Sequence, residues 1–428
     1  MLGAEYSTTD LDGAWESLKT GVYWQQTSRE FHRETAFFSN GSPGFAGPPL
    51  FVDPTSTVTT SVVDTDDEVN TYEWQTQVRR AFGEDHKTTF GFDLGYDDTN
   101  LPETETQAVV AIAGVGPVVG SSSSVDRVRA DANQTRFGLY AEDTWTIGDF
   151  DVIPGIRGDF FNIDNNNSDF NDDEFGLSGS VGGVYHLSKQ ESYYVSLASG
   201  FRVPDLGERF QNGIVNLGAP TRIIGKEDLD SERAWSAEVG TKRRAGKFTY
   251  EAAAYVNEIE NYIGTRPLGM IDGFVTDQYD NLGDVTLYGG EAAITYAVTD
   301  QIDLYANAAR TWTQDADKLD VTNWTFNYGV KHTQSVNNEW IDSVVAGFNL
   351  RTVLESEDLT PSAGKQTFDA GSFTVVDLFA NVNLSENKAG KATLVAGVRN
   401  LFDRTYQEPF FPMNQPERSG YVGVQFTF

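Results

Sequence analysis

Cysteine is absent from this chain of 428 residues, so a disulfide framework, a thiolate metal site and a cysteine nucleophile are all excluded. Basic residues are few: 31 lysines and arginines stand against 63 aspartates and glutamates, which gives a formal net charge of -32 at pH 7. A nucleic-acid surface needs clustered lysine and arginine to meet the phosphates, so we expect no nucleic-acid partner.

Long apolar runs are also missing. No segment approaches the roughly 18 residues expected of a transmembrane helix, which excludes a helical membrane protein. Residues 1–20 lack a basic stretch followed by an apolar core, so they do not form a secretory signal. The chain is nevertheless 39% hydrophobic and 13% aromatic, which is ample material for a folded body.

Apolar and polar residues alternate over stretches of about ten positions, a pattern that places every second side chain on one face of a β-strand. In one such stretch Val376, Leu378 and Ala380 share a face, while Asp377 and Asn381 share the other. The pattern predicts about sixteen strands, at residues 17–31, 71–82, 87–97, 134–147, 151–162, 175–186, 191–202, 231–242, 247–263, 276–297, 301–313, 323–331, 340–353, 372–384, 392–402 and 418–428.

The connections between these strands alternate in length. Short ones at 83–86, 148–150, 187–190, 243–246 and 298–300 interleave with long ones at 32–70, 98–133, 203–230 and 403–417. Outer-membrane barrels show this parity because one rim carries short periplasmic turns and the other carries long extracellular loops. The sequence therefore predicts an all-β fold, a transmembrane antiparallel up-and-down β-barrel, with its two low-complexity segments, 108–124 and 162–174, in long loops.

Aromatic residues recur near the predicted strand ends, at Trp145, Tyr193, Tyr194, Trp235, Tyr296, Trp312 and Trp324. Amphipathic rings at such positions would meet the lipid headgroups. Any one of them would also fit the core of a soluble β protein. A soluble closed barrel of this size would need a filled interior, whereas a lipid-facing barrel can keep the polar lumen that the second face of these strands predicts.

The chain ends on Tyr421-Val-Gly423-Val-Gln-Phe426-Thr-Phe428, with an apolar residue at every second position. The alternative is a plain edge strand, but a free hydrophobic edge invites aggregation unless closure pairs it. The segment resembles the C-terminal signal by which the outer-membrane assembly machinery recognises barrels. On that resemblance Tyr421, Gly423, Phe426 and Phe428 would form the assembly signal.

Several further blocks resemble the barrels of TonB-dependent outer-membrane receptors. The most specific are Gly200-Phe-Arg-Val-Pro204, which is similar to the family's "GFRxP" strand, and Val398-Arg-Asn400-Leu-Phe-Asp403-Arg-Thr-Tyr406 near the end of its barrel. Other blocks occur in the family's order at 136–143, 154–159, 229–232 with 238–242, 254–257 with 263, and 289–291. Each block is weak alone, and their order makes the resemblance strong.

The resemblance implies a barrel of about 22 strands, of which about sixteen are present here. Neither the family's lumen-filling plug nor its segment for the energising partner is recognisable. Residues 1–428 are therefore expected to be one receptor-type β-barrel, truncated at its N-terminus and without a plug domain. Expected partners are outer-membrane lipid and lipopolysaccharide, the assembly machinery, a TonB-type energy-transducing protein acting through the plug, and a small ligand such as an iron chelate.

No catalytic constellation stands out, so we do not expect an enzyme, a cofactor or a metal site. His32, His86, His186 and His332 fall at or near predicted strand ends, three of them near periplasmic turns, and are expected to be surface residues that titrate. The segment 164–174 offers oxygen ligands for calcium but lacks the glycine and glutamate positions of an EF-hand loop. A solvated acidic loop is the preferred interpretation.

The long outer loops would form the substrate surface. Candidate substrate-binding residues are Arg202, Arg209, Arg222, Tyr406, Phe410 and Phe411. Arginine suits anionic chelates and aromatic faces suit flat or greasy ones, as in ferric siderophores, although each residue would equally fit loop packing or contacts to lipopolysaccharide. Haem receptors of the family carry a histidine between the "FRxP" and "LxPE" blocks, and residues 205–228 contain none. This argues against haem as the substrate.

Two functions from different classes remain. The ordered family blocks favour an active transport receptor that imports a scarce nutrient such as a ferric siderophore, with energy from an inner-membrane TonB-type complex. The missing plug favours a passive, porin-like diffusion channel of about sixteen strands. Pairing between the strand at 17–31 and the strand at 418–428 would close a small barrel and favour the channel.

Overall fold

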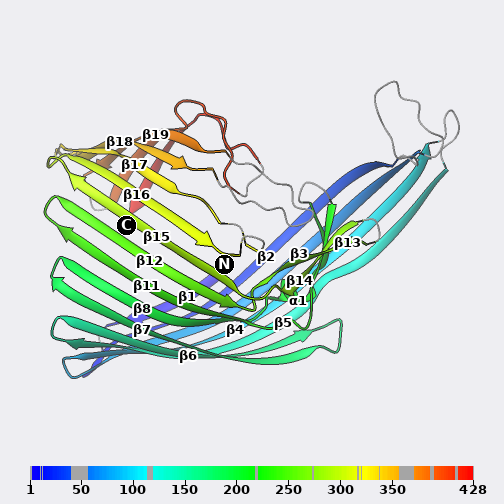
Figure 1. The fold of residues 1–428 in the computed structure, drawn as a ribbon, viewed down its shortest axis with the longest axis horizontal. Helices are drawn as coiled ribbons and strands as arrows, with labels where there is room; N and C mark the ends of the chain where they lie inside the picture. Colours follow the sequence, from blue (N-terminus) through cyan, green and yellow to red (C-terminus); the bar gives the residue numbers. More distant parts are fainter. Residues whose placement is uncertain are drawn as a thin grey trace.

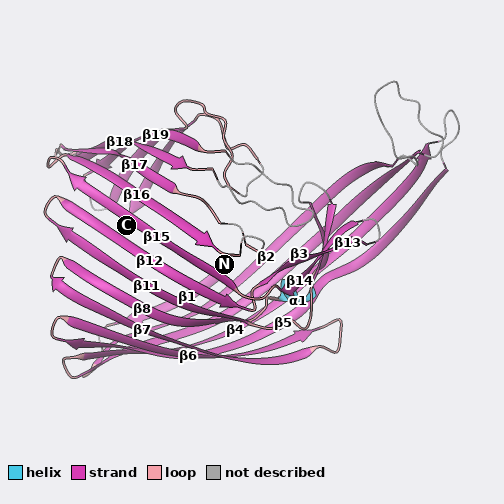
Figure 2. Ribbon diagram, in the orientation of Figure 1, coloured by secondary structure: helices cyan, strands magenta, loops and turns pink. Residues whose placement is uncertain are grey.

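The structure is a computed structural model that describes residues 2–9, 11, 13–39, 56–112, 119–216, 220–271, 274–315, 318–319, 321–336, 338–355, 371–385, 390–409 and 413–427. Within these residues the chain forms 21 strands and one short helix, α1 (Leu206–Phe210). No helix in the described part of the chain is long and apolar enough to span a membrane. Figure 2 shows how strongly strands dominate the molecule.

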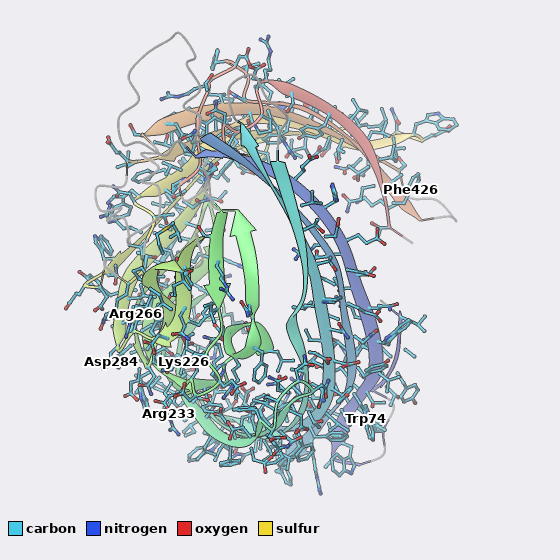
Figure 3. All side chains as sticks on the ribbon, turned by 90° about the vertical axis from the view of Figure 1, so that its right-hand side faces the viewer. Trp74, Lys226, Arg233, Arg266, Asp284 and Phe426 are labelled. Atoms are coloured by element: carbon cyan, nitrogen blue, oxygen red, sulfur yellow. The ribbon has the colours of Figure 1, made fainter. Side chains whose placement is uncertain are left out.

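Seventeen strands form one antiparallel sheet that curves around a central space (Figures 1 and 3). Each strand of this barrel sheet pairs with the next one along the chain, except where the inner strands described below intervene. The strands are β1 (Leu2–Thr8), β2 (Trp15–Ser39), β3 (Ser56–Phe82), β4 (His86–Ile112), β5 (Val119–Ile147), β6 (Phe150–Asn165), β7 (Asn171–Ser188), β8 (Glu191–Arg202), β11 (Glu232–Ala245), β12 (Phe248–Glu260), β15 (Val285–Ala297), β16 (Ile302–Thr313), β17 (Thr325–Ser335), β18 (Ile341–Val353), β19 (Phe373–Leu384), β20 (Lys391–Arg399) and β21 (Ser419–Thr427).

The predicted antiparallel up-and-down sheet is confirmed, with two corrections to its strands. The prediction missed β1, which pairs with β2 from Leu2 opposite Trp24 to Thr8 opposite Leu18. It also joined residues 276–297 into one strand, whereas the structure breaks this segment at Leu282–Asp284. Gly283 has φ of 81° there, and that left-handed turn separates an inner strand from β15. In the described residues β1 pairs only with β2 and β21 only with β20.

The loops predicted at 32–70 and 98–133 are strand wherever the structure describes them, which is a third correction. β2 to β5 contain between 25 and 29 residues each. A strand of 29 residues extends roughly 95 Å, about three times a hydrocarbon core of roughly 30 Å, so these strands must continue beyond the bilayer. Figure 1 shows them as an arm that leaves the rest of the sheet. Their threonine and valine content suits strands, and the low-complexity segment 108–124 belongs to this arm where it is described.

The short connections are confirmed as tight turns. Gly83, Gly148 and Gly246 have φ of 75°, 62° and 61°, a backbone conformation that favours glycine. All of these turns lie at one rim of the barrel sheet, and the long connections leave from the other. The rim with short turns is the periplasmic one and the opposite rim is the extracellular one.

The outward face of the barrel sheet carries two rows of aromatic side chains. Near the periplasmic turns Phe150 stacks on Tyr185 with ring centroids 4.7 Å apart, and Phe248 stacks on Tyr296 at 4.6 Å. The extracellular row includes Trp235, Tyr288, Trp312, Trp324 and Phe326. Tyr288 and Tyr296 lie on one face of β15, eight residues apart, so the two rows enclose roughly 26 Å of strand, which matches the apolar band of an outer-membrane barrel.

Tyr194 corrects the prediction of strand-end aromatics at headgroup level. It lies on the inward face of β8, opposite Gly240 of β11, and its hydroxyl donates to Glu238 at 2.7 Å. Its ring covers Gly240, where a Cβ atom would collide with the tyrosine. The same arrangement of an inward-facing ring over a directly opposite glycine recurs in the pairs Tyr23–Gly3, Tyr140–Gly91, Tyr255–Gly289, Tyr305–Gly329, Phe379–Gly347 and Tyr421–Gly397.

A second, four-stranded sheet lies inside the curve of the barrel sheet (Figure 3). It consists of β9 (Asn212–Asn216), β10 (Pro220–Ile224), β13 (Ile263–Ile271) and β14 (Phe274–Asn281), and we call it the inner sheet. Two extracellular connections build it, the one between β8 and β11 and the one between β12 and β15. They meet where β10 pairs in parallel with β14, from Thr221 opposite Val275 to Ile224 opposite Gln278.

Two small apolar clusters fix the extracellular connections on the barrel. Val203 and Leu206 pack with Ala132 of β5 and Ile163 of β6, which seats α1 against the wall. Val353, Phe373 and Val375 form the second cluster, at the extracellular ends of β18 and β19. No large central core is found in the described residues, as expected for a barrel whose interior is polar.

Candidate functional site

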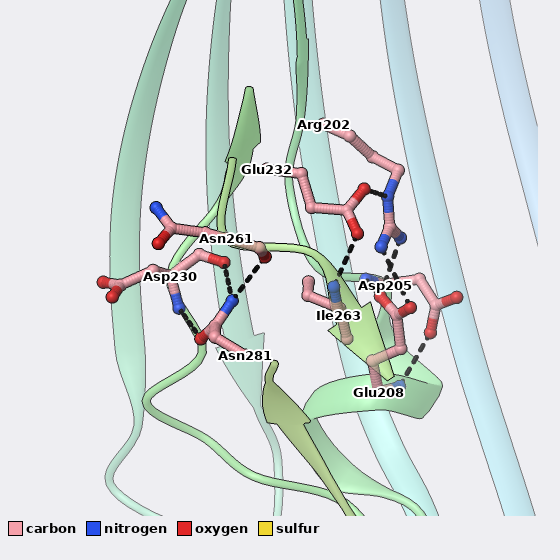
Figure 4. Close-up of polar contacts among 8 residues, drawn as sticks. All are labelled: Arg202, Asp205, Glu208, Asp230, Glu232, Asn261, Ile263 and Asn281. Atoms are coloured by element: carbon pink, nitrogen blue, oxygen red, sulfur yellow. Dashed lines mark hydrogen bonds and ion pairs between the residues drawn. The ribbon is translucent and has the colours of Figure 1, made fainter. Parts of the chain in front are cut away.

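The inner sheet is attached to the extracellular rim through a cluster of charged residues around Glu232, which we call the rim clamp: Arg202, Glu208, Glu232 and the backbone of Ile263 (Figure 4). Glu232, at the start of β11, accepts from Arg202 Nε at 2.6 Å and from the Ile263 backbone N–H at 2.7 Å. The other nitrogens of Arg202 donate to both carboxylate oxygens of Glu208 at 2.8 and 3.1 Å. Arg202 of β8 thus connects its strand to β11 and α1, and Glu232 of β11 connects its strand to β13.

Helix α1 begins with reciprocal capping. Asp205 accepts from the Glu208 backbone N–H at 2.7 Å, and Glu208 accepts from the Asp205 backbone N–H at 2.8 Å. This pairing satisfies donors that a helix end otherwise leaves unpaired. It also fixes the carboxylate of Glu208 where it meets Arg202, so the helix start orients one half of the rim clamp.

Arg209 follows in α1 and is almost completely buried, at 2% exposure. It pairs with Glu174 of β7, donates to the Glu227 backbone carbonyl at 2.7 Å, and lies 3.5 Å from Asp172. Its guanidinium also lies 5.6 Å from the centre of the Phe170 ring. Arg209 therefore holds α1 against the β6–β7 hairpin.

The two connections are joined by polar side chains as well as by the β10–β14 pairing. Asp280 of β14 accepts from Lys226 at 2.9 Å and pairs with Arg266 of β13 at 2.7 Å. The hydrogen bond from Lys226 lowers the pKa of Asp280, and the same bond raises the pKa of Lys226. Asn281 spans the junction by donating to the backbone carbonyls of Asp230 and Asn261 at 3.0 and 2.8 Å (Figure 4). Hydrogen bonds and ion pairs consequently hold the two connections together in one inner sheet.

Arg222 and Tyr406 are the other predicted substrate-binding residues that the structure describes. Arg222 lies in β10, where its Nε donates to Asn212 at 3.1 Å. Tyr406 lies far from it in sequence, in the last extracellular connection, and its ring packs on Phe373 at 4.5 Å. Burial there raises the pKa of the Tyr406 hydroxyl. Phe410 and Phe411 lie outside the described residues.

The last connection is held by the block that carried part of the family resemblance. Asn400 has φ of 50°, accepts from the Arg404 backbone N–H at 2.9 Å and donates to the Arg404 carbonyl at 2.8 Å. Glu408 forms a two-pronged pair with Arg351 of β18. The contacts between Asn400 and Arg404 show that this block forms a folded turn at the rim.

The predicted assembly signal lies on β21. Phe426 is 63% exposed on the outward face (Figure 3). Tyr421 lies on the inward face over Gly397. Gly423 is opposite Val395 of β20, and Phe428 lies outside the described residues. An exposed Phe426 beside a lipid-facing strand is compatible with recognition by the assembly machinery, which stays a prediction.

Histidines and the acidic segment show no arrangement for chemistry. His86 and His186 lie by periplasmic turns and contact Asp143 and Asp151 at 2.6 and 2.8 Å. His32 lies within the long β2 rather than at a strand end, opposite Asp64. Residues 162–174 form the tip of the β6–β7 hairpin instead of a long loop. No group of three or more His, Asp or Glu side chains that could hold a metal ion occurs in the described part of the chain.

Sequence reasoning missed Glu232, Glu208 and Asn281, which organise the mouth. A signal was present for the first, because Arg202 and Glu232 each belong to a block of the family resemblance, and the structure shows that the two blocks meet in one ion pair. Nothing in the sequence indicates that Glu208 would complete this cluster.

Comparison with known proteins assigns the chain to a family. The family model described as TonB dependent receptor-like, beta-barrel matches residues 1–401. The chain belongs to this family, whose members are outer-membrane transporters rather than enzymes. It therefore lies in the bacterial outer membrane.

Curated relatives agree with this assignment at low identity. The chain is 24% identical over 326 residues to an iron-regulated outer membrane virulence protein of Vibrio cholerae serotype O1, an alignment covering 70% of this chain and 46% of the relative. It is 22% identical over 298 residues to heme/hemopexin utilization protein C of Haemophilus influenzae, covering 65% of this chain and 41% of the relative. The chain thus spans less than half the length of these relatives.

Solved structures show the same fold. Copper transporter OprC superimposes with a TM-score of 0.71 at 17% identity, over 100% of this chain and 64% of that one. P. aeruginosa FpvA, in complex with heterologous pyoverdines, superimposes with a TM-score of 0.64 at 14% identity, over 99% of this chain and 55% of that one.

Proposed function

We propose that this chain forms the barrel of an active import receptor, which binds a scarce nutrient such as a ferric siderophore at its extracellular mouth. Energy for import would come from an inner-membrane TonB-type complex. The main support is the family match over residues 1–401. The names of relatives point in the same direction, because they include an iron-regulated protein, a haem utilisation protein and a receptor bound to pyoverdines.

The architecture of the mouth supports a receptor more than an open pore. The inner sheet lies inside the curve of the barrel sheet (Figure 3), and contacts of Asp280 and Asn281 hold its two connections together as one body. A body held there offers a surface for recognising a ligand and leaves less room for free diffusion. The passive-channel hypothesis, by contrast, would have been favoured by pairing between the first and last strands. In the described residues β1 and β21 do not pair with each other.

The binding residues proposed from the sequence take different roles in this picture. Arg222 on the inner sheet and Tyr406, with the neighbouring Phe410 and Phe411, remain the proposed contacts to the ligand. Arg202 and Arg209 are each engaged by carboxylates, so we assign them to positioning the inner sheet. An iron chelate is favoured over haem, because residues 205–228 contain no histidine to ligate a haem iron.

Binding and permeation assays on the purified chain test the proposal. Ferric siderophores of the catecholate, hydroxamate and pyoverdine classes are titrated against tryptophan fluorescence, with ferric citrate and haemin as comparison ligands. Saturable quenching by one chelate, weakened at least fivefold in Arg222→Gln, is expected. In parallel, liposomes containing the chain are swollen in sugars of increasing size. Size-dependent swelling without any saturable chelate binding would establish the passive channel instead.

A further inference from the structure

Arg80 lies on the outward face of the barrel sheet at its periplasmic rim. β3 ends at Phe82, directly before the short turn at 83–85, so Arg80 is two residues from that rim. It shares a face of β3 with Trp74, which points outward in Figure 3, because alternate side chains of a strand lie on one face. Glycerophospholipids make up the periplasmic leaflet of an outer membrane that has lipopolysaccharide outside. Arg80 therefore lies at the level of phospholipid head groups.

Two aromatic rings hold the guanidinium of Arg80 in place. Trp15 of β2 is directly opposite Arg80, and the guanidinium carbon lies 4.7 Å from the centre of its ring. The same carbon lies 4.7 Å from the centre of the Phe82 ring. Both rings are exposed on the outward face, as members of the periplasmic aromatic row. Two cation–π contacts thus fix a positive charge at the membrane boundary before any ligand binds.

The positive charge of Arg80 has no protein anion beside it among the described residues. Its Nε is buried without a hydrogen-bond partner, and its terminal nitrogens are accessible and also make no hydrogen bond or ion pair with the described part of the chain. In register along the same face come Thr88 and then Asp143, two strands away. Asp143 already accepts from Thr88 at 2.8 Å and contacts His86 at 2.6 Å. The guanidinium is consequently open to an anion from the membrane.

An apolar surface begins directly beside Arg80 on the side of the bilayer. Leu18, Val78 and Phe90 lie in register across β2, β3 and β4, one outward position further from the periplasmic rim. In the next row the hydroxyls of Thr20 and Thr76 bind each other at 2.8 Å, so these polar groups are satisfied within the wall. A hydrocarbon chain can therefore lie along this face while its head group reaches the guanidinium.

We propose that Arg80 binds the phosphate of a glycerophospholipid in the periplasmic leaflet, whose acyl chain lies against the row of Leu18, Val78 and Phe90. The planar guanidinium can donate to two phosphate oxygens at once, and such charge-assisted bonds are strengthened beside apolar surroundings. The recognised group is the phosphate, which phosphatidylethanolamine and phosphatidylglycerol share. The site depends on the position of the chain in the membrane and not on the nutrient that it imports.

Native mass spectrometry of the full chain in detergent tests the site. Phosphatidylethanolamine, phosphatidylglycerol and diacylglycerol, which lacks the phosphate, are added in turn, and retained lipid is counted. We expect one retained molecule of either phospholipid, and about tenfold less of either in Arg80→Gln, because charge-assisted hydrogen bonds to the phosphate are lost. Trp15→Leu should reduce retention about threefold, since one of the two cation–π contacts that position the guanidinium is removed.

Arg79→Gln is the matched control, because Arg79 is the adjacent arginine of β3 and faces the lumen. It should leave retention unchanged, and circular dichroism should show the same strand content in all variants. Inorganic phosphate at millimolar concentration should not displace the lipid; its displacement would assign Arg80 to the free anion and overturn the proposal. Equal retention of diacylglycerol would also overturn it, as would unchanged phospholipid retention in Arg80→Gln or an equally large loss in Arg79→Gln.

Discussion

Removal of the Glu232 carboxylate should release the inner sheet from the barrel. In the structure this group accepts two hydrogen bonds, from Arg202 Nε at 2.6 Å and from the Ile263 backbone N–H at 2.7 Å, and its side chain is 12% exposed. Glu232→Ala takes away both and leaves the Ile263 N–H without a partner in a site that water reaches poorly. Arg202 retains Glu208, so the charge of the guanidinium stays compensated.

The magnitude follows from these contacts. Breaking a buried ion pair costs about 3–5 kcal/mol, and an orphaned backbone donor about 1–3 kcal/mol. Arg202 is 43% exposed and keeps a second carboxylate, so the ion-pair part must be reduced for solvent screening. A net weakening of about 2–4 kcal/mol is expected for docking of the inner sheet, which corresponds to roughly 30- to 1000-fold more frequent opening.

Hydrogen exchange read by mass spectrometry measures this opening directly. Peptides from residues 263–271 and 274–281 should exchange faster in Glu232→Ala by that factor, while peptides from β8 and β12 stay unchanged. Glu232→Gln can still accept the Ile263 hydrogen bond, so its exchange rate should lie between those of the wild-type chain and Glu232→Ala. Glu258→Ala serves as the control, because Glu258 faces outward on the adjacent strand β12, away from the inner sheet. An acceleration below threefold would refute the role of the rim clamp.

Three further outcomes are expected. The pKa of the Asp280 carboxyl is lowered in the folded chain, so its stabilisation of the inner sheet should be complete above the ordinary pKa of 3.8 and should be lost as the pH falls below that value. Hydrogen exchange of residues 274–281, measured against pH, should show this step, and Asp280→Asn should remove it. Gly397→Ala should lower the free energy of unfolding, measured by urea titration, by about 1–3 kcal/mol, because its Cβ would lie 2.5 Å from the hydroxyl of the overlying Tyr421. Gly420→Ala, whose Cβ would lie 3.8 Å from the nearest atom, should leave it unchanged. Arg209→Met should cost about 3–5 kcal/mol and expose residues 203–231 to protease, whereas the exposed Arg266→Ala should cost less than about 1 kcal/mol.

Much of the barrel could be predicted from the sequence because its side chains obey a strict period of two. The strand predicted at 191–202 has the bounds of β8, and the five short turns all occur as expected. The prediction failed where that period weakens. Residues 56–70 and 98–112 mix Thr, Val and acidic residues without a regular apolar/polar alternation, so they lack the period on which strand prediction depends.

The mouth was harder to predict for a different reason. The parallel pairing of β10 with β14 joins segments more than 50 residues apart, and no local pattern encodes such a contact. Arg202 and Arg209 were selected as charged loop residues that could meet a ligand. Their carboxylate partners lie on other elements, Glu232 on β11 and Glu174 on β7, so their engagement became visible only once the strands were placed.

The rings that cover glycines on the inward wall have a consequence for how this sequence can change. In each pair, two positions on neighbouring strands share a single volume, so that bulk added on one strand must be omitted from the next. Such positions cannot vary independently. Exchanging the members of one pair, for example Tyr194→Gly together with Gly240→Tyr, should be tolerated better than either change alone, and a double-mutant cycle would record the shared space as a favourable coupling.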